Sequence, residues 1–181
     1  MADINFSARP NRPAEPADAD KSALEPIWDI IELLFFAYRD FVGDPDHVLE
    51  RLRFGRAHHR VLHFVNRNPG MKVADLLDIL KITKQSLGRV LKQLIDQGYI
   101  VQKAGPNDRR QRLLYVTQKG EALALKLAGL QTERIAGALA DLNPAAQDAA
   151  RRFLAAMINA EDRDEVLRLI ARGNRARRAL P

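Results

Sequence analysis

The chain has 181 residues, of which 46% are hydrophobic, and it carries a formal net charge of +6. That apolar fraction is sufficient for one folded domain with appendages, and the absence of cysteine excludes a disulfide framework, a thiolate metal site and a cysteine nucleophile. No apolar run has the length of a signal-peptide core or a membrane span, so we expect a cytoplasmic protein with no membrane partner, and the basic balance favours an acidic partner such as nucleic acid.

The N-terminal part predicts an arm followed by one unusually apolar helix. Residues 1–25 are rich in proline and poor in apolar side chains, which predicts a flexible arm. A helix is expected from about Pro26 to about Val42, ending before the Gly-Asp-Pro sequence at residues 43–45. Apolar side chains cover most of its circumference, so more than one neighbour must bury it. A second subunit is the natural candidate, and burial inside the monomer is the alternative.

After a polar link, a second helix is expected at about residues 55–66, and it carries three histidines. His59 and His63 are four residues apart and share a helix face, a spacing that metal ligands also use. No cysteine or nearby glutamate completes a tetrahedral metal site. A pH-responsive or ligand-contacting role is a second hypothesis, because imidazole titrates near neutrality. We favour a third interpretation, in which His58, His59 and His63 form hydrogen bonds at a contact between helices.

Two helices joined by three residues follow a turn at residues 68–70. Apolar spacing predicts a short helix over residues 73–80, and residues 81–83 connect it to a basic helix. Thr83 is placed as the N-cap of the basic helix and Gly98 as its C-terminal stop. This pattern is a helix-turn-helix unit, whose second helix enters the major groove of DNA with its N-terminal residues first. The candidates for contacts with base edges and phosphates are Thr83, Lys84, Gln85, Ser86, Arg89 and Lys92, and Gln93 shares their polar face.

Two short β-prone runs, at residues 99–103 and 112–117, flank a turn-forming loop that carries arginines. Residues 81–112 hold eight basic and two acidic side chains, so their excess of six equals the net charge of the whole chain. A basic field concentrated in one segment is what phosphate binding requires. We therefore predict a DNA-binding winged helix-turn-helix, although charge alone would also fit a solvated helix face. The wing candidates are Asp108, Arg109, Arg110 and Arg112.

The C-terminal third predicts further helices. A long helix should run from Thr117 to about Leu142, and Asn143 with Pro144 forms an N-cap and N1 pair that opens another. Both are alanine-rich, which allows close helix packing, and residues 164–172 predict one more helical piece. Residues 163–181 hold six arginines against two acidic side chains. This tail either contacts the DNA backbone or is a solvated end, and we favour the second.

From residue 26 to about residue 158 the chain resembles the MarR family of bacterial transcriptional regulators. The likeness rests on the order of the helices, on Gly98-Tyr99-Ile100 and above all on the wing, where the chain matches the family's pattern at Asp108, Arg110, Arg112, Thr117 and Gly120. The resemblance implies a mainly α fold with a small β-hairpin wing, and a homodimer that binds pseudo-palindromic double-stranded DNA. It also implies that Arg109 or Arg110 enters the minor groove, whose negative potential attracts arginine, and that Asp108 pairs with Arg110 or Arg112.

On this basis we divide the chain into a flexible arm (1–25), a dimerisation helix with its linker (26–54), a winged helix-turn-helix domain (55–117) and C-terminal dimerisation helices with a basic tail (118–181). The resemblance further implies a repressor that a small aromatic or phenolic effector releases from DNA. The alternative is a metal- or pH-responsive regulator that uses the three histidines. No phosphate loop, nucleophile elbow or paired metal motif is present, so we predict that the protein is not an enzyme and needs no cofactor. Candidates for an effector pocket are Phe35, Tyr38, His58, His59 and His63.

Overall fold

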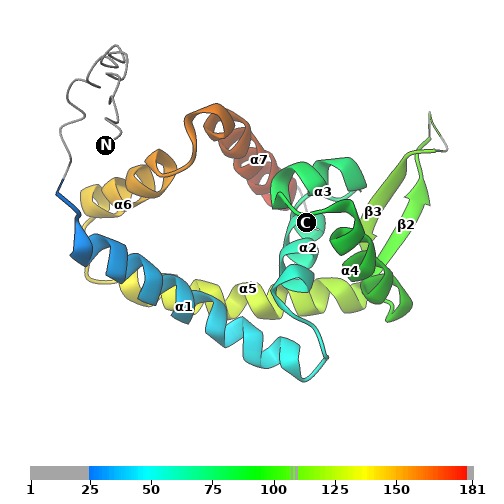
Figure 1. Cartoon of the computed structure of the whole chain (residues 1–181), viewed down its shortest axis with the longest axis horizontal. Coiled ribbons are helices and arrows are strands. Elements are labelled where there is room, and N and C mark those ends of the chain that lie inside the picture. The colour runs from blue at the N-terminus through cyan, green and yellow to red at the C-terminus, as the bar shows by residue number, and fades with distance from the viewer. Residues whose placement is uncertain (1–24, 107, 109, 179–181) are drawn as a thin grey trace, which may run out of the picture.

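The computed structural model describes residues 25–106, 108 and 110–178. The chain is mainly helical with one small antiparallel sheet, as expected (Figure 1). Apart from Glu25, the arm predicted at residues 1–25 lies outside the described residues. In chain order the elements are α1 (Trp28–Glu50), α2 (Arg56–Arg67), β1 (Met71–Lys72), α3 (Val73–Leu80), α4 (Lys84–Asp96), β2 (Ile100–Ala104), β3 (Arg112–Val116), α5 (Gln118–Leu139), α6 (Pro144–Ala156) and α7 (Ala160–Arg178).

Helices α2, α3 and α4 and the sheet form a lobe at one end of the molecule, from which α5 runs out beside α1 (Figure 1). The strand order is β1-β3-β2, and in the β2–β3 hairpin Ile100 pairs with Val116. Strand β1, in which Met71 pairs with Leu114, was not predicted. Two residues are too few to show the alternation of apolar and polar side chains by which a strand is recognised.

The hydrophobic core lies inside this lobe and is built from helical and strand positions together. On α4 the buried positions recur every three or four residues, as the sequence predicts. Complete burial of one such side chain stabilises the fold by about 1.5–3 kcal/mol relative to exposure. The fully buried residues of the core are Leu49, Val61, Leu62, Val65, Leu76, Leu87, Leu94, Ile100, Leu114 and Leu127.

Helix α1 does not end at Val42, and this boundary prediction was wrong. The helix continues through Pro45 to Glu50, so the expected polar link is largely helical. A proline inside a helix costs about 3 kcal/mol, because it removes a backbone hydrogen bond and crowds the preceding turn. Here Pro45 and Leu49 are buried, and flanking carboxylates form ion pairs with Arg134 and Arg56 at 2.8 Å. These tertiary contacts offset the local cost.

The N-terminal half of α1 is not buried within its own chain. Its large apolar side chains are between 38% and 70% exposed, which is far more than isolated surface residues contribute. The alternative of burial inside the monomer is therefore wrong for this stretch. The exposed residues are Ile27, which directly precedes α1, and Trp28, Ile30, Ile31, Leu33, Leu34, Phe35, Phe36 and Tyr38 of α1.

The last helix is longer than predicted, because α7 spans Ala160–Arg178 where only residues 164–172 were expected. It returns to the lobe and packs against α2 (Figure 1). Gly173 does not end the helix; it is buried where the guanidinium of Arg67 crosses, and a Cβ there would lie 2.9 Å from Arg67 Nη2. Within the described ranges, no helix combines the length and the hydropathy that a membrane span requires.

The junction between the wing and α5 depends on a close backbone approach. Thr117 caps α5 by accepting a hydrogen bond from the Gly120 N–H at 3.0 Å, and its own hydroxyl donates to the Gly98 carbonyl at 2.7 Å. Gly120 is buried against Tyr99, and a Cβ at Gly120 would lie 2.0 Å from the Tyr99 carbonyl oxygen. The glycine of the Thr-x-x-Gly pattern is therefore required for packing.

We expect Gly120→Ala to lower the free energy of unfolding by about 1–3 kcal/mol, because the methyl group forces the backbone of Tyr99 to move. The measurement is urea denaturation followed by circular dichroism. The control is Gly137→Ala in the same helix, where an added Cβ meets nothing within 4 Å of it and alanine gains up to about 1 kcal/mol in helix propensity. Equal stability of Gly120→Ala and the unmodified chain would contradict the close approach.

Candidate nucleic-acid interface

Helix α4 presents a buried apolar face and an exposed polar face. It begins with the predicted cap, in which Thr83 Oγ1 accepts a hydrogen bond from the Ser86 N–H at 3.1 Å and donates to Ser86 Oγ at 2.9 Å. The hydroxyl groups of Thr83 and Ser86 are therefore hydrogen-bonded to each other. The side chains left on the outer face are Lys84, Gln85, Arg89 and Lys92, all exposed.

These outer side chains are suited to contact an anionic partner. Lys92 forms an ion pair with Asp96 one turn later on the helix, but both groups are exposed, so the pair contributes only about 0.3–0.5 kcal/mol. Gly88 lies on the same exposed face, and a Cβ there would meet nothing within 4 Å. Among the residues that the structure describes, no packing contact requires a glycine here, and its small size leaves the helix backbone accessible.

The connection between α3 and α4 is held in a left-handed conformation at Lys81, which has a φ of 50°. Lys81 Nζ lies 3.5 Å from the carboxylate of Asp162 in the first turn of α7. The helix-turn-helix is thus in contact with the C-terminal helix. Both partners are partly or fully exposed, so this ion pair adds little stability.

The wing extends from the lobe as the hairpin of β2 and β3 (Figure 1). Asp108 orders its loop by accepting a hydrogen bond from the backbone N–H of Arg110 at 2.9 Å. This differs from the expected pairing of Asp108 with the guanidinium of Arg110 or Arg112, which is absent among the residues that the structure describes. Arg110 and Arg112 are exposed, whereas Arg109 lies outside the described residues.

The three histidines of α2 have different environments. His58 Nε2 lies 2.9 Å from Gln93 Oε1 on α4, which confirms the predicted hydrogen bond at a helix contact for this residue. Burial lowers the pKa of His63 below its ordinary value, and the charges of His59 and Arg67 lower it further. Burial also lowers the pKa of His59, partly offset by Asp46. Over residues 25–106, 108 and 110–178, no three histidine, aspartate or glutamate side chains converge as a metal site would require.

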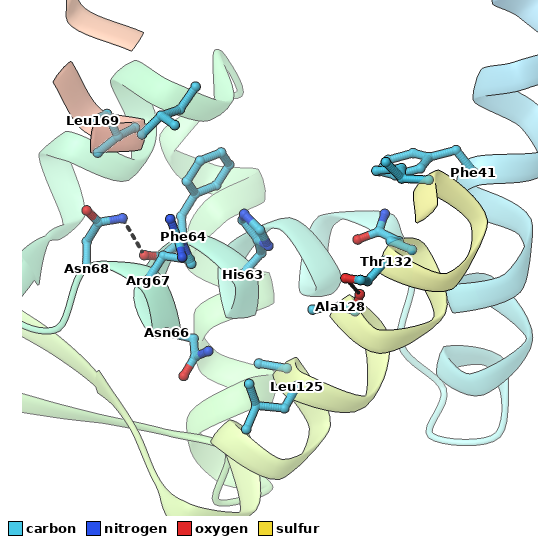
Figure 2. Close-up of a pocket in the computed structure, with 14 residues that line it drawn as sticks. Phe41, His63, Phe64, Asn66, Arg67, Asn68, Leu125, Ala128, Thr132 and Leu169 are labelled. Atoms are coloured by element: carbon cyan, nitrogen blue, oxygen red, sulfur yellow. Dashed lines mark hydrogen bonds between the residues drawn. The ribbon is translucent and has the colours of Figure 1, made fainter. Parts of the chain in front are cut away.

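A pocket of about 370 Å³ lies between α2, α5, α1 and α7. Figure 2 shows His63, Phe64 and Arg67 of α2 on one side, Leu125, Ala128 and Thr132 of α5 on another, and Phe41 of α1. Of the five predicted pocket residues, His63 alone lines this pocket; Phe35 and Tyr38 are exposed on α1, and His58 points to α4. Arg67 was missed, although its spacing of four from His63 places it on the same helix face.

The chain is similar to known transcriptional regulators in sequence and in fold. The model of the MarR family matches residues 54–111. The HTH-type transcriptional regulator PetP of Rhodobacter capsulatus is 45% identical over 129 residues, which cover 71% of this chain and 78% of that protein. A MarR family regulator from Listeria monocytogenes, solved with a 26mer DNA, is 23% identical with a TM-score of 0.63, over 80% of this chain and 93% of that chain. FabT of Streptococcus pneumoniae, solved with DNA, is 17% identical with a TM-score of 0.62, over 71% and 92%. The two solved structures, at these identities, show a shared fold.

The lowered pKa values of His59 and His63 have a consequence for stability. The folded chain favours neutral imidazoles there, whereas the unfolded chain protonates them near the ordinary pKa of 6.5. The stability that the neutral forms contribute is present above pH 6.5 and is lost as the pH falls through the lowered pKa values.

We therefore expect the free energy of unfolding to fall between about pH 7 and about pH 5, and to fall less in a His59→Gln/His63→Gln double variant. Urea denaturation at both pH values measures the effect. His47→Gln, which removes an exposed histidine of α1, is the control and should keep the full pH dependence. An undiminished pH dependence in the double variant would mean that other groups cause it.

Proposed function

Because the chain belongs to the MarR family and is a transcriptional regulator rather than an enzyme, we propose that it acts as a homodimer on pseudo-palindromic double-stranded DNA. The observation that carries this proposal is the exposed polar face of α4, capped at Thr83 and flanked by the arginine-bearing wing. In a helix-turn-helix this face enters the major groove. Arg89 and Gln85 have the chemistry to bind base edges, because arginine pairs with guanine and glutamine with adenine.

The charge distribution supports contact with the DNA backbone. The excess positive charge of the chain falls within residues 81–112, which form α4 and the wing. Lysines and arginines in such a segment displace counterions from phosphates, which supplies sequence-independent affinity. We assign Lys84 and Lys92 to phosphates and the wing residues Arg109, Arg110 and Arg112 to the adjoining minor groove, with Asp108 ordering the loop.

The exposed apolar half of α1 supports a dimer. Exposed side chains on the later helices add to it, including Leu154 of α6 at 60%. We propose that a second copy of the chain buries this surface. The twofold symmetry of such a dimer would place its two α4 helices about one turn of DNA apart. We propose the division into arm, dimerisation helices and DNA-binding domain on the same grounds. A DNA partner also supports our expectation of a cytoplasmic protein.

The proposed binding is tested on a duplex site enriched from random sequences, titrated with salt, with the mass of the complex measured by sedimentation. We expect one dimer per site. Arg89→Ala should weaken binding by about 1–3 kcal/mol and relax the sequence preference, while Arg110→Ala should weaken binding and lower the salt slope by about 1. Lys126→Ala, an exposed change on α5, is the control. Unchanged affinity in both arginine variants, or a monomer that binds no DNA, would contradict the proposal.

We further propose that the pocket of about 370 Å³ holds a small aromatic or phenolic anion that releases the regulator, a repressor, from DNA. Its volume is within the range of small-molecule sites, and its lining is mostly apolar. Arg67 offers a guanidinium, which binds a carboxylate in a bidentate way. Since α2 of the lobe, α1 and α5 all line the pocket, a ligand there would shift the spacing of two lobes in a dimer.

Benzoate, and benzamide as its neutral counterpart, probe this pocket. We expect benzoate to raise the melting temperature and benzamide to raise it less, because only benzoate gains a charged partner at Arg67. Arg67→Met keeps the apolar stem and removes the guanidinium, so the extra effect of benzoate should disappear. The matched control is Arg152→Met on the exposed side of α6. Equal increments from both probes in the unmodified chain would rule out an anion site at Arg67.

A further inference from the structure

One side chain of the polar face of α4 is directed into the protein. Gln93 Oε1 lies 2.9 Å from His58 Nε2 at the start of α2, and Gln93 Nε2 donates to the carbonyl of Arg53 at 3.1 Å. The sequence separations are 35 and 40 residues, so both contacts are tertiary. Gln93 therefore joins α4 to α2 and to the turn that follows α1, whereas the sequence placed it on the outward polar face of α4.

The hydrogen bonds of this group require one protonation state and one amide orientation. The backbone N–H of Gly55 donates to His58 Nδ1 at 3.1 Å, so Nδ1 is the acceptor and Nε2 carries the proton. Nε2 then donates to Gln93 Oε1, which leaves the Gln93 amide nitrogen to donate to Arg53. Every donor in the chain of bonds meets an acceptor, and reversing the amide of Gln93 would break two bonds.

The surroundings hold the group in place. Arg53 has a φ of 56°, a left-handed conformation that costs a non-glycine residue about 1–2 kcal/mol and that directs its carbonyl here. The ring of Phe54 stacks on His58, with centroids 4.7 Å apart and an angle of 11° between the planes. Phe54 also packs edge-on against Tyr99, at 5.2 Å, beside the base of the wing. The turn after α1, the start of α2, α4 and the base of the wing thus meet at one point.

We propose that His58 and Gln93 are positioning residues for DNA recognition, which fix the orientation of α4 relative to α1. This inference rests on the proposed function, in which α1 forms the dimer and α4 contacts the bases. Apolar packing of α4 is non-directional and tolerates small rotations, whereas hydrogen bonds are directional. Base contacts require placement within about 0.5 Å. The His58–Gln93 joint, in which hydrogen bonds run from α4 to α2 and to the turn that follows α1, therefore sets the spacing of the two α4 helices in the proposed dimer.

The test is Gln93→Met, which keeps the length of the side chain and removes both hydrogen bonds. We expect affinity for the selected DNA site to fall about tenfold, while affinity for unrelated DNA and the salt slope stay unchanged. Gln97→Met, at the exposed end of the same helix, is the matched control. If Gln93→Met does not fold, Gln93→Asn, which is too short to reach both partners, replaces it.

His58→Leu separates positioning from direct contact. If Gln93 acts through His58, His58→Leu lowers the ratio of specific to unrelated binding to the same extent, and the double variant is no worse than either single one. Independent losses that add, or an unchanged ratio in His58→Leu, would overturn the proposal. An unchanged ratio in Gln93→Met would also overturn it.

A measurement without DNA separates this inference from the proposed function. The ring nitrogen signals of His58 in a ¹⁵N-labelled sample should report a protonated Nε2 and an unprotonated Nδ1. Gln93→Met should shift the Nε2 signal, because Nε2 loses its acceptor, while the Gly55 N–H still donates to Nδ1. A mixture of tautomers in the unmodified chain would refute the joint even if DNA binding is specific. Failure of the unmodified protein to bind any DNA would refute the proposed function and the positioning role with it, whatever the tautomer.

Discussion

The burial of one face of α4 in the core of the lobe decides what its other face can do. Leu87 and Leu94 are fully buried in the core, and Val90 and Leu91 between them are buried as well. Rotation of the helix to expose two such leucines would cost about 3–6 kcal/mol, which is comparable with the stability of a whole domain. The polar side chains are therefore held outward by the core. The hydrogen bonds of Gln93 to His58 and Arg53 are directional, so they limit the small rotations of α4 that apolar packing tolerates.

Helix α5 connects this lobe to the apolar helices outside it. Its first turn is fixed at the wing by Thr117 and by the close approach of Gly120 to Tyr99. Further along, Arg134 binds Asp44 of α1 through two nitrogens, at 3.0 and 2.8 Å. One helix thus packs against both the wing and α1, with the pocket at Arg67 beside it. In the proposed function this continuity is what would let an effector in the pocket alter the spacing of the DNA-binding helices.

The expectations that differed from the structure have a common physical origin. Pro45 and Gly173 are helix breakers by local criteria, yet both are buried inside helices, because burial and ion pairs with distant residues outweigh the local cost. Asp108 orders the wing loop by accepting a hydrogen bond from the backbone N–H of Arg110, and not from a guanidinium. Both donors lie close to Asp108 in the sequence, so residue spacing does not show which one it binds. Gln93, which the sequence placed on the polar face of α4, forms a hydrogen bond with His58 inside the protein.

Local signals were sufficient for most of the fold and for the outer face of α4. The helix caps Thr83, Thr117 and Asn143 each accept a hydrogen bond from an N–H three residues later. Apolar periodicity likewise lies within one helix. Both signals can therefore be recognised in a short stretch of sequence. The pocket and the His58–Gln93 joint depend on contacts between residues far apart, such as Arg67 with Asn174, 107 residues later. Only the packing of the helices brings such pairs together, because no local pattern encodes which distant side chain fills a given space.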